Sequence, residues 1–97
     1  MNVLQLNKAF DNRIRLGIMS ALIVNHELNF NALKEFLQIT DGNLASHLKN
    51  LEENGYIQFK KGFVGRKTNT VYFITIDGKK AFQEHLNVLE GMIQSIR

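Results

Sequence analysis

Residues 39–57, ITDGNLASHLKNLEENGYI, have the pattern of one helix with a defined beginning and end. Thr40 is suited to cap the start, and Gly55 supplies the left-handed conformation that commonly ends a helix. Three leucines recur at helical spacing, which predicts one buried seam along this helix. They are Leu44, Leu48 and Leu51.

The opposite side of this helix is polar, and its residue types are unusual. A face that only contacts water is the simpler interpretation, but such faces are typically rich in Glu and Lys. This one offers mainly short amide, hydroxyl and imidazole groups, which are suited to base edges or phosphates. The set is Gly42, Asn43, Ser46, His47, Lys49 and Asn50.

Two further helices are expected before this stretch. Asp11 is expected to cap a helix with two apolar stripes, which would be either central in its domain or shared with another chain. Asn31 is expected to cap a short helix that is joined to the next by QIT, residues 38–40. So tight a link makes two helices cross steeply, as in a helix-turn-helix. The stripes are Ile14, Ile18 and Leu22, and Leu16, Met19 and Ile23; the short helix carries Leu33, Phe36 and Leu37.

A β-hairpin is predicted after Gly55. The segments YIQFKKGF (56–63) and TNTVYFITI (68–76) are rich in β-branched and aromatic residues and flank VGRK, which holds a turn glycine. Removing the four basic charges of residues 57–76 from the net charge of +3 leaves the rest of the chain at −1. Cationic charge concentrated at the outer end of a hairpin suits a polyanion, and a solvated lysine-rich hairpin is the alternative.

A last helix is expected from Asp77 as its cap. Its apolar residues follow a three- and four-residue rhythm to the C-terminus, so the stripe either meets the same helix of a second copy or packs back on the first helix and on Val3, Leu4 and Leu6. The stripe consists of Phe82, Leu86, Leu89, Met92, Ile93 and Ile96.

Length and composition restrict the class of protein. A chain of 97 residues, 44% hydrophobic and 22% charged, suits a single globular domain spanning 1–97. The absence of cysteine excludes a disulfide framework and a thiolate metal site and favours a cytoplasmic location. No signal peptide or membrane-spanning run is evident, so neither export nor membrane insertion is expected.

The order of elements and the string ITDGNLASHLKNLEENGYI resemble the winged helix-turn-helix DNA-binding domain of small bacterial and archaeal transcription regulators, in particular the compact single-domain members of the MarR/ArsR-like group. FNALKEFLQ resembles the preceding positioning helix, and TVYFITIDGKKAF resembles the second wing strand entering the last helix. The resemblance covers about residues 11–82. It implies an α+β, mainly helical fold, with a helical core over 11–55, a wing over 56–76 and a C-terminal dimerisation helix over 77–97.

The resemblance also implies a function: a homodimeric transcription regulator, expected to repress, that binds a palindromic operator in double-stranded DNA. On the recognition helix the implied contacts are Thr40, Asp41, Gly42, Asn43, Ser46, His47, Lys49 and Asn50, with Asp41 mainly stabilising the helix start. On the wing they are Lys60, Lys61, Arg66, Lys67 and Thr68. The implied dimer interface consists of Leu86, Leu89, Met92, Ile93 and Ile96.

Other chemistries have weaker support in the sequence. Ser46 and His47 are neighbours on a helix and point about 100° apart, so they do not form a nucleophile and base, and we expect no enzyme activity. His26, His47 and His85 lack metal-ligand spacing, so neither a metal nor a cofactor is expected. The chain lacks the extra helices that form an effector crevice in larger relatives. A winged helix used as a protein-binding module is the main alternative.

Overall fold

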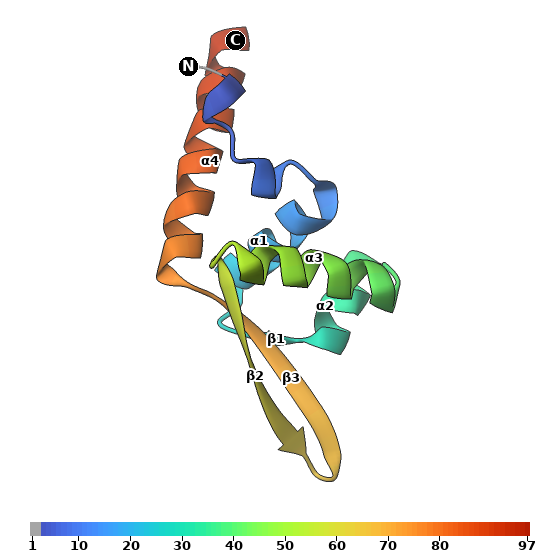
Figure 1. Ribbon diagram of the computed structural model, residues 1–97. Helices are drawn as coiled ribbons and strands as arrows, with labels where there is room; N and C mark the ends of the chain where they lie inside the picture. Colours follow the sequence, from blue (N-terminus) through green and yellow to red (C-terminus); the bar gives the residue numbers. More distant parts are fainter. Residues whose placement is uncertain (1–2) are drawn as a thin grey trace.

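The computed structural model describes residues 3–97 and shows four α-helices, two short 3-10 helices (η1 and η2) and a three-stranded antiparallel sheet (Figure 1). In chain order the elements are η1 (Val3–Gln5), η2 (Lys8–Phe10), α1 (Arg13–Val24), β1 (Leu28–Asn29), α2 (Phe30–Leu37), α3 (Asp41–Glu53), β2 (Ile57–Val64), β3 (Lys67–Ile74) and α4 (Ile76–Ile96). This architecture confirms the predicted winged helix fold.

The core lies where α1, α2 and α3 meet the base of the hairpin and the start of α4. The leucine seam of α3 is buried as predicted, and every other element except η1 contributes residues to the same core. In α1 the first stripe is buried at Ile18 and Leu22, whereas Ile23 of the second stripe is 40% exposed. The central residues of the core are Ile18, Met19, Leu22, Leu33, Leu44, Leu48, Leu51, Ile57 and Phe82.

Three of the four predicted helix caps are wrong by one or two residues. Asn12 rather than Asp11 caps α1, Asn29 rather than Asn31 caps α2, and Thr75 rather than Asp77 caps α4. In each case the observed cap has extended backbone, and its side-chain oxygen accepts a hydrogen bond from an N–H of the first turn. Asp77 lies in the first turn of α4, where its negative charge still favours the helix dipole.

The helix-turn-helix is confirmed. α2 ends at Leu37 and α3 begins at Asp41, so the link is the predicted 38–40. Thr40 caps α3, its Oγ1 accepting from the backbone N–H of Asn43 at 3.2 Å. Gln38 takes the left-handed conformation that ends α2, with a φ of 56°.

The hairpin of β2 and β3 is the wing, and it projects away from the helices (Figure 1). Val64 pairs with Lys67, leaving Gly65 and Arg66 as a two-residue turn. Gly65 has a φ of 64° and Arg66 has no positive φ, which is the pattern of a type II′ turn. β1 pairs with the inner half of β3 and was not predicted, because a strand of two residues has no periodicity to detect.

α4 runs along one side of the molecule, and the N-terminal turns η1 and η2 lie beside it (Figure 1). Its stripe is buried only near its start: Phe82 is 2% exposed, whereas Ile93 is 50% and Ile96 is 84% exposed. The prediction that the stripe packs back on the N-terminal residues is confirmed in part, since Leu6 and Leu89 line a common hollow, while the end of the stripe remains uncovered. No helix among residues 3–97 is long and apolar enough to cross a membrane.

Candidate nucleic-acid interface

The exposed face of α3 is a strip of short polar groups on a rigid helix. Gly42, Asn43, Ser46 and Lys49 are all exposed, and the buried leucines behind them fix the helix against the core. Within residues 3–97 the side-chain amide of Asn43 has no hydrogen-bond partner, while its backbone N–H donates to Oγ1 of Thr40. This amide is therefore free to bind a group outside the chain.

Other residues predicted for this face already have partners. Asp41 forms an ion pair with Lys34 of α2, with 2.7 Å between the carboxylate and Nζ, which offsets a charge that DNA would repel. Asn50 is half-buried, and its Oδ1 lies 3.4 Å from Nδ2 of Asn54. Asp41 lies in the first turn of α3, where a negative charge favours the helix dipole.

His47 lies on the flank of this face and contacts an arginine that the sequence analysis missed. Nη1 of Arg15, in the first turn of α1, lies 3.0 Å from Nδ1 of His47. Burial lowers the pKa of His47 below its ordinary value of 6.5, and the positive charge of Arg15 lowers it further. Arg15 is 32 positions away in sequence, so no local pattern could have revealed this pair.

The predicted wing residues do not form a single cluster. Side chains alternate along a strand, so Lys61 and Thr68 share one face with Ile57, while Lys60 and Lys67 lie on the other. Lys60 is opposite Val71, beside β1, and its Nζ lies 3.5 Å from a carboxylate oxygen of Glu27.

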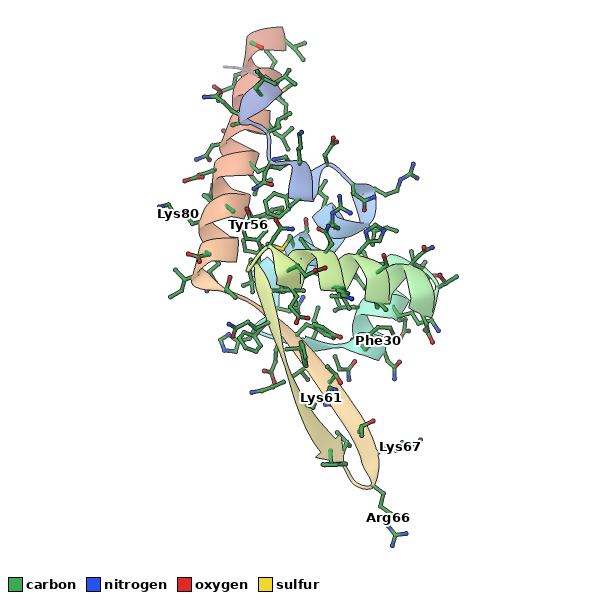
Figure 2. The ribbon with its side chains drawn as sticks, in the orientation of Figure 1. Phe30, Tyr56, Lys61, Arg66, Lys67 and Lys80 are labelled. Atoms are coloured by element: carbon green, nitrogen blue, oxygen red, sulfur yellow. The ribbon has the colours of Figure 1, made fainter. Side chains whose placement is uncertain are left out.

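The prediction that all four basic residues lie at the outer end is therefore wrong for Lys60 and Lys61. Figure 2 shows Arg66 extending from the tip of the wing with Lys67 near it, and Lys61 farther up the hairpin. Nζ of Lys61 lies 5.9 Å from the centre of the Phe59 ring, a cation–π distance. The cationic tip of the wing consists of Arg66 and Lys67.

Two apolar residues beside that tip were also missed. Phe63 is 74% exposed and Val64 is 67% exposed, directly before the turn. Apolar residues at these positions fit an ordinary strand pattern, so the sequence does not indicate that they are exposed. They are uncovered because the wing extends away from the core.

The predicted dimer residues follow one side of α4 beyond the core. Leu86 packs against the core, and Leu89 lines a hollow of about 440 Å³ together with Val3, Leu4 and Leu6. Val3 and Leu4 are 65% and 87% exposed. Leu89 and the N-terminal turns thus line one hollow, and beyond it the last turns of α4 expose Ile93 and Ile96.

Comparison with known proteins identifies the class. A family model described as a winged helix DNA-binding domain matches residues 14–93, and the chain belongs to this family. The match includes α2, α3, both wing strands and most of α4.

Individual relatives agree with this assignment. The chain is 39% identical over 79 residues to an uncharacterized protein of Methanocaldococcus jannaschii, covering 81% of this chain and 86% of the relative. It is 32% identical to a transcriptional regulator homologue protein from Pyrococcus horikoshii, with a TM-score of 0.84 over 91% of this chain and 87% of the other. The fold also matches Bacillus subtilis PadR in complex with operator DNA, at a TM-score of 0.69 and 20% identity, over 77% of this chain and 47% of PadR.

Proposed function

We propose that this protein is a sequence-specific, double-stranded-DNA-binding transcription regulator that acts as a homodimer. α3 enters the major groove, and the wing contacts the backbone or the adjacent minor groove. The observation that carries the proposal is the exposed polar face of α3, with its unpaired Asn43 amide, on the same domain as a wing with a cationic tip. The relatives described as transcriptional regulators support it.

The dimensions of α3 suit the major groove. The groove is about 12 Å wide and admits one helix, and base pairs present distinct donor and acceptor patterns there. The free amide of Asn43 can pair with both N6 and N7 of adenine, a contact worth about 1 to 3 kcal/mol of discrimination. Gly42 lies in the first turn, where a Cβ would meet no atom within 4 Å, so the backbone there is open to a phosphate.

The wing supplies contacts that do not depend on sequence. Arg66 and Lys67 lie at the end of a rigid two-stranded ribbon, where a phosphate or a narrow minor groove can reach both. Lys60 contributes less, because Glu27 offsets part of its charge. We therefore assign the wing to affinity and α3 to specificity.

A homodimer would place two copies of α3 in successive major grooves. The uncovered apolar residues of α4 and of the N-terminal turns form a surface for a second copy. A two-fold axis through this surface implies a palindromic operator with half-sites about 34 to 36 Å apart. Occupancy of such a site would block access of other proteins to it, so we propose repression.

Selection from random-sequence duplex DNA with the purified protein tests this proposal. We expect an enriched palindrome, and Asn43→Ala should remove the preference at one position of each half-site while retaining non-specific binding. Lys79→Ala, on α4 and away from α3, is the matched control. If wild-type protein enriches no sequence, specific DNA recognition is wrong, and a protein-binding role for the winged helix becomes the better account.

A further inference from the structure

Arg15 joins three separate parts of the fold. Its Nε donates to the carbonyl oxygen of Ala9 in η2 at 2.6 Å, and its Nη1 lies 3.0 Å from Nδ1 of His47 in α3. The guanidinium group is therefore held at two points by elements on either side of α1. A planar group held at two points has little freedom to turn, so it fixes the plane and position of the ring that it contacts.

This contact determines which nitrogen of His47 carries the proton. Arginine has donors but no acceptor, so Nδ1 of His47 must be the acceptor and carries no hydrogen. Burial, followed by the charge of Arg15, lowers the pKa of His47, which favours the neutral ring. The hydrogen of a neutral ring with a bare Nδ1 is on Nε2, so His47 is a donor through that atom.

The Nε2 atom is available to an outside partner. Within residues 3–97 it has no hydrogen-bond partner, and no buried side-chain nitrogen in that range lacks one, so Nε2 reaches solvent. Asn43, His47 and Asn50 are spaced four and three residues apart, which puts them along one strip of α3. The donor thus lies on the flank of the proposed DNA-reading face, in line with these two amides along the helix.

The position of Arg15 is unfavourable for the helix that carries it. Arg15 lies in the first turn of α1, which contains no acidic residue, and a cation there opposes the helix dipole. Stabilisation of α1 therefore does not account for an arginine at this position. Its contacts with Ala9 and His47 indicate a different role.

We propose that Arg15 is a positioning residue that fixes His47 as an Nε2–H donor for a hydrogen-bond acceptor of duplex DNA. The acceptor is either N7 of a purine base or a phosphate oxygen. The DNA-binding part of this proposal rests on the proposed function. The fixed tautomer of His47 is a property of the free protein and does not depend on DNA.

Long-range ¹H–¹⁵N NMR of the free protein tests the fixed tautomer. At pH 7.5 we expect a neutral His47 ring protonated on Nε2. Arg15→Lys keeps the positive charge but loses the planar fork, so it should produce a mixture of both neutral tautomers. A wild-type ring protonated on Nδ1, or the same tautomer population in Arg15→Lys, overturns the proposal without any reference to DNA.

A double-mutant cycle on a selected operator tests the donor role. His47→Leu should weaken binding about three- to tenfold, the range for one hydrogen bond. Arg15→Lys should weaken wild-type binding by a similar factor and have little effect in the His47→Leu background. Fully additive effects contradict the coupling. Modified operators identify the acceptor. If wild-type and His47→Leu bind an operator with 7-deazapurines equally well, the acceptor is a base atom. If they bind an operator with methylphosphonates equally well, the acceptor is a phosphate.

The NMR experiment and the binding experiment have independent outcomes. If wild-type protein binds no duplex, the proposed function and the donor role are both wrong, while the NMR result still decides whether Arg15 fixes the His47 ring.

Discussion

Gly42 and Gly78 are both helical glycines in a first turn, but their surroundings differ completely. A Cβ on Gly78 would lie 2.0 Å from the carbonyl oxygen of Tyr56, which is backbone, whereas a Cβ on Gly42 would meet nothing within 4 Å. That carbonyl also accepts from the N–H of Thr75 at 3.0 Å, so it cannot move without loss of a hydrogen bond. The close approach at Gly78 locks the start of α4 onto the segment between α3 and β2.

We predict opposite effects of alanine at these two positions. Gly78→Ala should lower the free energy of unfolding by about 1 to 3 kcal/mol or more, because the backbone must shift to relieve the overlap. Gly42→Ala should raise it by about 0.5 to 1 kcal/mol, since alanine restricts the unfolded chain and favours the helix. Urea unfolding of both variants measures this, and equal effects would contradict the packing described at Gly78.

We predict that two histidines, His47 and His85, make the free energy of unfolding depend on pH. Burial lowers the pKa of His47 and, as the larger of two opposing effects, the pKa of His85, whose Nδ1 accepts from the backbone N–H of Asn7 at 3.0 Å. In the unfolded chain both groups return to a pKa of about 6.5, so the unfolded state binds more protons below that pH. The free energy of unfolding should therefore fall as pH falls through 6.5, and this effect should stop growing below the folded-state pKa.

Urea unfolding at pH 7.5, 6.5 and 5.5 checks the pH prediction. Replacing both His47 and His85 by glutamine should flatten the dependence over this range. His26→Gln, at an exposed position, is the matched control. A wild-type protein that is equally stable at all three pH values would contradict the assignment.

Of the four helix caps, the sequence identified only Thr40 correctly. Near every helix, two suitable acceptors lie within two positions of each other. Long-range contacts decide among them: Thr75 is selected over Asp77 because its Oγ1 also donates to the carbonyl oxygen of Gly55, at 2.7 Å. Sequence patterns do not contain that information.

At the scale of elements, the basic residues of the wing differ in where they lie and in whether they are paired. Its register leaves Arg66 and Lys67 at the tip, whereas Lys60 lies beside β1 and is paired with Glu27. The sequence predicted the hairpin and its basic content correctly, because strand propensity and a turn glycine are local signals. It did not predict which basic residues are free, because Glu27 is contributed by the segment between α1 and α2.

We predict that the tip of the wing accounts for part of the salt dependence of DNA binding. Arg66→Ala and Lys67→Ala together should weaken binding to all sequences and reduce the slope of log affinity against log salt by about 2 per subunit. Lys60→Ala should change the slope less. Binding to duplexes at 50 to 200 mM salt, measured by fluorescence anisotropy, distinguishes the two, and equal slopes for wild-type and the tip variant would exclude the wing from the interface.

At the scale of the molecule, the domain measures 53 × 26 × 21 Å along its principal axes. The wing lies at one end and the last turns of α4 at the other (Figure 1). The proposed DNA contacts of the wing and the apolar surface of α4 are thus separated, so two copies could associate through α4 without covering either wing. The sequence indicated this surface but left open whether the chain itself covers it; the exposure of Ile93 and Ile96 shows that the N-terminal turns cover only part of it.

We predict that Ile93→Lys converts a dimer into a monomer. A lysine at this half-exposed position costs the folded monomer little, but in a dimer interface it would be buried without a partner. Sedimentation equilibrium of wild-type and variant measures this. Lys80→Glu, on the same helix at an exposed position, is the control, and a monomeric wild-type protein would contradict dimerisation through α4.

The central claim is that a leucine-anchored helix presents polar groups to duplex DNA while the wing binds the backbone. Titration of a labelled duplex with purified protein at 50 mM salt tests it most directly, with an uncharged peptide nucleic acid duplex as the reference ligand. We predict saturable binding to DNA that weakens by about 10³ to 10⁵ between 50 and 200 mM salt, for six to eight phosphate contacts per dimer. Equal attraction to DNA and to the uncharged duplex at low salt would contradict the account.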